Sequence, residues 1–270
     1  MVSVGISSQF LFQEGKGVHD LAEYIESDPF RKPQPAIWQV LDEGPQQLVG
    51  SNLKEVKELV SKGFRISVHA PNEKQFNIAH HDPRTRNDAI HRMKNSLEAA
   101  ASCEAVWWIL HAGYDTQGGR MLDDVKENNN DSIQKLWDLA HSLGIPLLVE
   151  NAPPLQGYDL VSPERFIDLI SGAGIKLKVA FDIGHSKMSK NIPDFVDRVS
   201  SAFMTVECSD NDGEQDLHLP LEEDNPEWKG TIDRLCDTGY AKAFVVETNE
   251  DPLPSFSALS KYVSQRFLLF

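Results

Sequence analysis

Six residues that can bind a metal ion occur where apolar runs of the sequence end. They are His69, His111, Glu150, Asp182, Glu207 and Glu247, with His185 just beyond Asp182, and with Asp210, Asp216 and His218 following Glu207. An unpaired buried charge is costly, so a carboxylate at the end of a buried run needs a partner. Four carboxylates in one low-dielectric pocket would repel one another, and a divalent cation would remove that repulsion. These residue types therefore indicate a divalent metal site.

The segments that must position these residues alternate between two patterns. Eight apolar, β-branched runs predict strands at residues 2–6, 36–40, 64–70, 105–112, 145–151, 176–182, 202–208 and 243–248. Amphipathic stretches with helix-capping signals lie between them, for example Asp82 before Pro83 and Ser162 before Pro163. Strands that alternate with helices predict a parallel α/β fold, and eight units favour a closed (β/α)8 TIM barrel. We expect one domain over residues 1–270.

A parallel barrel would bring the six strand-end residues together, because all strands end on the same rim. A lone His or Glu at a strand end is more often a hydrogen-bonded polar residue or a helix cap than a ligand. Six in succession reverse that expectation and favour a metal site. Trp38, near the end of a predicted strand, could line the pocket. The polar stretch 209–230 is long enough to be a functional loop.

Composition narrows the possible partners and compartments. The formal net charge of -15 argues against nucleic-acid binding, which depends on Lys and Arg contacts. Cys103, Cys208 and Cys236 form no CxxC pair, so neither a disulfide framework nor a thiolate zinc site is indicated. The sequence contains no signal-peptide pattern and no apolar stretch of the roughly 18 residues that a membrane span needs. We therefore expect a cytoplasmic protein with no membrane partner.

The ordered motifs of the chain resemble those of a known family. "SVHAP", "ILHAG", "LLVENAP", "FDIGH", "DNDGEQDLHLPL" and "VVET" resemble the xylose-isomerase-like TIM-barrel superfamily. That group joins sugar and sugar-phosphate isomerases and epimerases with the endonuclease IV family of DNA-repair enzymes, also called AP endonuclease family 2. The resemblance extends from Val4 to Glu247 and implies a TIM barrel with a metal site at its mouth.

The resemblance also implies particular ligands. The superfamily's central metal ligands fall on Glu150, Asp182 and Glu247, with Glu207 at a position where the family usually has His. An all-carboxylate set suits Mg²⁺ or Mn²⁺ better than Zn²⁺. The further zinc ligands of the endonuclease IV branch match His69, His111, His185, Asp216 and His218. Segments 70–72 after the third strand and 183–184 after the sixth depart from the pattern of the endonuclease IV branch, which argues against DNA repair. Segment 222–224 departs from the sugar-acting members, which carry glycines there.

Two enzymatic mechanisms follow as expectations. The first is a metal-dependent isomerase or epimerase of a sugar, a sugar phosphate or a related hydroxycarbonyl compound, acting through a metal-stabilised enediolate. Glu150 and Glu247 would exchange the proton, and His185 would assist. His185, His218, Trp38 and Asn151 would contact the substrate. The second is an endonuclease IV-like phosphodiesterase with two or three zinc ions. A catalytically altered sugar-binding relative is a third possibility, and barrels of this group often form homo-oligomers.

Overall fold

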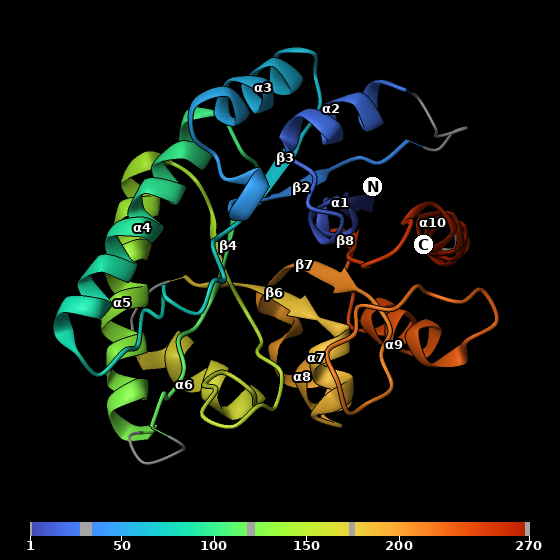
Figure 1. Ribbon diagram of the computed structural model, residues 1–270. Coiled ribbons are helices and arrows are strands. Elements are labelled where there is room, and N and C mark those ends of the chain that lie inside the picture. Colours follow the sequence, from blue (N-terminus) through green and yellow to red (C-terminus); the bar gives the residue numbers. More distant parts are fainter. Residues whose placement is uncertain (1, 28–33, 118–121, 173–175, 268–270) are drawn as a thin grey trace.

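The chain forms a closed barrel of eight parallel strands, in the order β1 to β8, in a computed structural model (Figure 1). The structure describes residues 2–27, 34–117, 122–172 and 176–267. The strands are β1 Ser3–Ser7, β2 Trp38–Leu41, β3 Ile66–His69, β4 Trp108–His111, β5 Leu147–Glu150, β6 Lys178–Asp182, β7 Phe203–Cys208 and β8 Ala243–Val246. The predicted (β/α)8 TIM barrel is confirmed, and each predicted strand overlaps an observed one.

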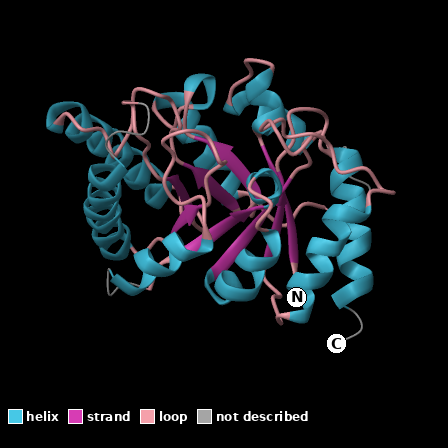
Figure 2. Cartoon of the chain, turned by 90° about the horizontal axis from the view of Figure 1, so that it is seen from below, coloured by secondary structure: helices cyan, strands magenta, loops and turns pink. Residues whose placement is uncertain are grey.

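Helices surround the barrel. Figure 2 shows the strands in magenta with the helices around them in cyan. They are α1 Gln9–Gln13, α2 Val18–Glu26, α3 Gly50–Ser61, α4 Pro83–Ser102, α5 Leu122–Leu143, α6 Pro163–Gly172, α7 Ile183–Met188, α8 Ile192–Val199, α9 Pro226–Asp237 and α10 Leu253–Phe267. Short 3-10 turns span Gly44–Gln46 and Ser200–Ala202. The predicted cap of α4 is present, because the Asp82 side chain accepts a hydrogen bond from the Thr85 amide at 2.9 Å.

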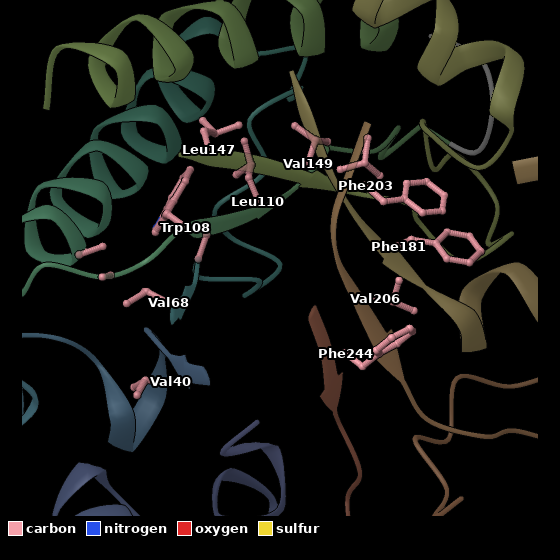
Figure 3. Close-up of a cluster of buried hydrophobic side chains, with 14 of the residues drawn as sticks. Val40, Val68, Trp108, Leu110, Leu147, Val149, Phe181, Phe203, Val206 and Phe244 are labelled. Atoms are coloured by element: carbon pink, nitrogen blue, oxygen red, sulfur yellow. The ribbon is translucent and has the colours of Figure 1, made fainter. Parts of the chain in front are cut away.

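Alternation along the strands separates two apolar layers. Outward-facing residues pack beneath the helices, including Val68, Trp108 and Phe181 in Figure 3. A smaller cluster includes Ile109 and Leu148. Its strand residues alternate along the chain with the outward-facing ones. These two layers fix the strands on both faces, so the side chains at the strand ends have defined positions.

One sequence expectation needs refinement. The polar stretch 209–230 is a loop only as far as Asn225, because Pro226 begins α9 and the Asn225 side chain accepts from the Glu227 amide. We call residues 209–225 the β7–α9 loop. Among the described residues, no helix is long and apolar enough to cross a membrane.

Candidate active site

The six predicted strand-end residues meet at the carboxyl-terminal mouth of the barrel. His69, His111, Glu150 and Asp182 are the last residues of β3, β4, β5 and β6. Glu207 is the penultimate residue of β7, and Glu247 follows β8 directly. A cavity of about 270 Å³ opens here and is lined by Gln9, Phe12, Gln13, Leu41, Glu43, His69, Asn72, His111, Glu150, Pro153, Leu155, Tyr158, His185, Asp216, His218 and Glu247.

Glu150 lies among three imidazoles. His111 is its cross-strand neighbour, and His111 Nε2 is 3.2 Å from Glu150 Oε2. His69 Nε2 lies 3.4 Å from the same oxygen, and His185 Nδ1 lies 3.3 Å from Glu150 Oε1. Ligand atoms of His69, His111 and Glu150 fall within 4.8 Å of one another, so these three residues form a first group that could hold a metal ion.

The second group comes from α7 and the β7–α9 loop. Asp216 bridges two imidazoles, with its carboxylate oxygens 3.2 Å from His185 Nε2 and 3.4 Å from His218 Nε2. The loop is attached to α7 because Lys187 donates to Asp210 at 2.6 Å. These contacts bring Asp216 and His218 to the barrel mouth although they lie beyond the end of β7. The loop thus places Asp216 and His218 beside His185.

The third group consists of carboxylates. Asp182 and Glu207 are register partners on β6 and β7, and together with Glu247 they offer oxygens within 4.8 Å of one another. Glu247 Oε1 accepts hydrogen bonds from Ser7 Oγ at 3.1 Å and from Gln39 Nε2 at 3.2 Å. Sequence reasoning missed both donors. The signal for Gln39 was a polar residue inside an otherwise apolar strand, and the signal for Ser7 was its place at the end of β1, since buried polar groups usually have a hydrogen-bond partner.

Backbone contacts set the orientation of three imidazoles. Nδ1 of His69 is 2.8 Å from the Ala70 carbonyl oxygen, and Nδ1 of His185 is 2.7 Å from that of Asn151. Nδ1 of His218 is 3.1 Å from the carbonyl oxygen of Glu247. An Nδ1–H that donates to a carbonyl leaves Nε2 available as a metal ligand or a substrate contact. In each case Nε2 lies near a carboxylate of the site.

The histidines and carboxylates shift one another's pKa. Burial lowers the pKa of His69, but a hydrogen bond to Glu150 and the charge of that carboxylate raise it to about 9. Burial also lowers the pKa of His218, which the bond to Asp216 and the charge of Glu247 raise to about 10. Burial raises the pKa of Glu150, but its imidazole neighbours hold it well below its usual range. In metal-free protein, imidazolium groups therefore balance part of the carboxylate charge.

Asp182 and Glu207 are less well balanced. Burial raises the pKa of Asp182 to about 6 despite the opposing charge of His185. Burial and the neighbouring carboxylates raise the pKa of Glu207 well above its usual range. Within the described part of the chain, Asp182 Oδ2 and both Glu207 oxygens are buried without a hydrogen-bond partner. Such oxygens destabilise a protein unless a cation contacts them, so this group fits a divalent metal ion.

Two residues predicted to contact the substrate have other positions. Trp38 is the first residue of β2, is 2% exposed and makes an edge contact with the ring of Tyr24 on α2. Its side chain therefore faces the helical layer, whereas Gln39 reaches the site. Asn151 is 1% exposed, and its amide pairs with both backbone groups of Asp182, at 2.7 Å and 2.9 Å. Asn151 therefore positions Asp182 rather than lining the cavity.

The first turn after β6 explains one departure from the family pattern. Asp182 caps α7, because its Oδ1 accepts from the His185 amide at 2.6 Å. A Cβ atom at Gly184 would lie 3.1 Å from Asn211 Nδ2 and 3.1 Å from Ser209 Oγ. Asn211 Nδ2 also donates to the Gly184 carbonyl at 2.8 Å. The glycine thus allows the β7–α9 loop to pack closely against the residue that precedes His185.

Comparisons with known proteins agree with this architecture. The uncharacterized protein MJ1311 of Methanocaldococcus jannaschii is 26% identical over 234 residues, covering 84% of this chain and 80% of that protein. A solved D-tagatose 3-epimerase-like protein superposes with a TM-score of 0.87 at 23% identity, with 98% of each chain covered. D-psicose 3-epimerase, solved in the presence of D-fructose, gives 0.75 at 15% identity, with 99% of each chain covered. At these identities the two solved structures establish the fold.

A family model described as xylose isomerase-like TIM barrel matches residues 22–264. The match includes seven of the eight strands and every residue of the three ligand groups. The protein therefore belongs to the xylose isomerase-like TIM barrel family.

Proposed function

We propose that the protein is a divalent-metal-dependent isomerase or epimerase of a sugar or a related hydroxycarbonyl compound. The observation that carries this proposal is the Asp182, Glu207 and Glu247 group: Asp182 Oδ2 and both Glu207 oxygens are buried without a hydrogen-bond partner, and Glu247 lines a cavity of about 270 Å³. Glu150, Asp182, Glu207 and Glu247 would hold the ion, and oxygen donors favour Mg²⁺ or Mn²⁺. When bound, the ion would neutralise the carboxylates and polarise a substrate carbonyl.

Glu150 and Glu247 are the proposed proton-transfer residues. They come from β5 and β8, which are not adjacent in the barrel, and both line the cavity. One carboxylate would remove the proton from the carbon next to the carbonyl, and the other would return a proton to the opposite face. Ser7 and Gln39 both donate to Oε1 of Glu247 and hold that oxygen in place. Oε2 takes part in neither contact.

His185 and His218 are the proposed partners of substrate hydroxyls. Both line the cavity, and the backbone contacts of their Nδ1 atoms fix the direction of Nε2. No Lys or Arg occurs among the described residues that line the cavity, which supports a sugar without a phosphate group. The likeness to solved sugar epimerases, including 3-keto-D-glucoside 4-epimerase from E. coli with a TM-score of 0.71, supports the same class of reaction.

Solvent deuterium exchange tests the proposal. Protein loaded with Mn²⁺ or Mg²⁺ would be incubated in D2O with a panel of ketoses, aldoses and their phosphates, and the products followed by NMR. We expect deuterium at the carbon beside the carbonyl of at least one sugar, together with the isomer or epimer. Absence of exchange across the panel with a metal-loaded sample would contradict the proposal and favour a sugar-binding protein that has lost catalysis.

A metal-dependent phosphoesterase is the second candidate, and a specific observation favours it. The groups His69, His111 and Glu150, and His185, Asp216 and His218, lie beside the carboxylate group in the same site. Hydrolysis of a phosphate ester commonly uses several cations to stabilise the attacking and leaving oxygens. Two or three zinc ions per chain and hydrolysis of a phosphodiester, with no sugar exchange, would favour this function over the first.

A further inference from the structure

His218 has an unusual backbone conformation for its position. Its φ of +46° lies in the left-handed region, which side chains other than glycine rarely adopt. Glu104, Leu160 and Lys190 share this feature. Glu104 and Lys190 lie just beyond the ends of α4 and α7, where a left-handed residue often terminates a helix, and Leu160 lies before α6 and does not line the cavity. His218 instead lies within the β7–α9 loop. Such strain persists only where surrounding contacts enforce it, and it is concentrated at functional sites.

Asn249 supplies those contacts from the segment after β8. Its side-chain Nδ2 donates to the Leu217 carbonyl at 2.9 Å, and its backbone amide donates to the His218 carbonyl at 2.9 Å. The two bonds hold the peptide groups on either side of the His218 Cα atom. Gln9 Nε2 in turn donates to Asn249 Oδ1 at 3.0 Å, which fixes the amide of Asn249 with its Nδ2 toward the loop.

The chain beyond His218 is also fixed, so the strain cannot be relieved there. Leu219 and Asp210 exchange two backbone hydrogen bonds, of 2.7 Å and 2.9 Å. With both flanks held, the imidazole of His218 remains 14% exposed, with Nδ1 on the Glu247 carbonyl and Nε2 facing Asp216. A relaxed, negative φ at His218 would turn the ring away from these partners.

We propose that Asn249 is a positioning residue that holds His218 in the left-handed conformation and so directs His218 Nε2 into the cavity. Asn249 does not line the cavity itself and acts through His218. The inference rests on the proposed function only in treating this cavity as the catalytic site.

Crystal structures and kinetics of Asn249→Ala and Asn249→Asp in the metal-loaded protein test the proposal. The Asp variant keeps the shape of the side chain but loses the donor to Leu217, so it tests the contact if the Ala variant folds poorly. Asn52→Ala is a matched control, because its amide also donates to two backbone carbonyls, of Pro45 and Gln47, at 2.9 Å, and it does not line the cavity.

In both Asn249 variants we expect a negative φ at His218 and loss of its contact with the Glu247 carbonyl. For a sugar that the wild type converts, KM should rise about tenfold with a smaller change in kcat, as expected when one substrate contact is lost. Asn52→Ala should leave the φ of His218, its contact with the Glu247 carbonyl, KM and kcat unchanged. Retention of the left-handed φ and of the ring position in both Asn249 variants would overturn the role of Asn249. Absence of turnover in the wild type would contradict the proposed function, while the crystal structures would still decide the role of Asn249.

Discussion

His111 and Glu150 end adjacent strands in register, and Nε2 of the histidine lies 3.2 Å from Oε2 of the glutamate. Both are therefore placed by the same β4–β5 ladder. His69 contacts the same carboxylate oxygen from β3. Glu150 is thus the residue that joins the imidazole side of the site to its carboxylate side.

Loss of either proposed base should abolish catalysis without unfolding the protein. In Glu150→Gln and in Glu247→Gln we expect kcat to fall by about 10² to 10⁴, because each removes a proton-transfer group while keeping its shape. Turnover of the sugar identified by deuterium exchange would be measured, with circular dichroism to check the fold. Glu98→Gln on the exposed face of α4 is the control and should be fully active. Wild-type turnover in either site variant would remove that residue from the mechanism.

The residue at position 207 should determine which metal is preferred. Glu207→His replaces a carboxylate ligand with an imidazole nitrogen ligand. Because imidazole suits Zn²⁺ better than Mg²⁺ or Mn²⁺, we expect the ratio of zinc to manganese affinity to rise by at least tenfold. Competitive titration of the apoprotein with the two metals measures this ratio. An unchanged ratio would show that Glu207 does not contact the ion.

Stability of the metal-free protein should fall as the pH rises above neutrality. The pKa values of His69 and His218 are raised from about 6.5 to about 9 and about 10, so the folded state binds these protons more tightly than the unfolded state. Their contribution is complete below pH 6.5 and is lost as the pH rises through 9 to 10. Urea unfolding from pH 6.5 to 10 should show this decline, and His69→Gln should make it shallower. Constant or increasing stability over this window would contradict the assigned shifts.

Asn151→Ala should destabilise the protein strongly. It removes both amide contacts with the Asp182 backbone and leaves a buried N–H without its acceptor, at a cost of about 2 to 4 kcal/mol. Asn128→Ala, which removes one 3.3 Å contact with the Ala79 carbonyl, should cost less than about 1.5 kcal/mol. Denaturant unfolding of both variants gives the comparison. Equal losses would show that the pairing of Asn151 with Asp182 is not a major stabilising contact.

The strand-end residues could be found from the sequence because two regular features determine their place. Hydrophobic runs locate the strands, and parallel barrel closure puts every strand end on one rim. His69, Asp182 and Glu247 needed no further information. Asp216 and His218 lie beyond the strand end, so the sequence places them only in the loop after Glu207, and their assignment as ligands depends on the resemblance of the segment "DNDGEQDLHLPL" to the family.

The roles of Trp38 and Asn151 could not be predicted in the same way. A shift of one residue in strand alternation moves a side chain to the opposite face, and the parity of β2 places Gln39 inside and Trp38 outside. Asn151 pairs with Asp182, 31 residues away, so its role depends on a tertiary contact that local patterns do not encode. The left-handed conformation of His218 has the same origin, since it depends on Asn249.

The most direct test of the account is the metal content of the protein purified without added metal, measured by elemental analysis. We predict one Mn²⁺ or Mg²⁺ per chain in the wild type and its loss in the Asp182→Asn, Glu247→Gln double variant. Equal metal content in the two proteins, or no metal in the wild type after incubation with either ion, would contradict the central claim.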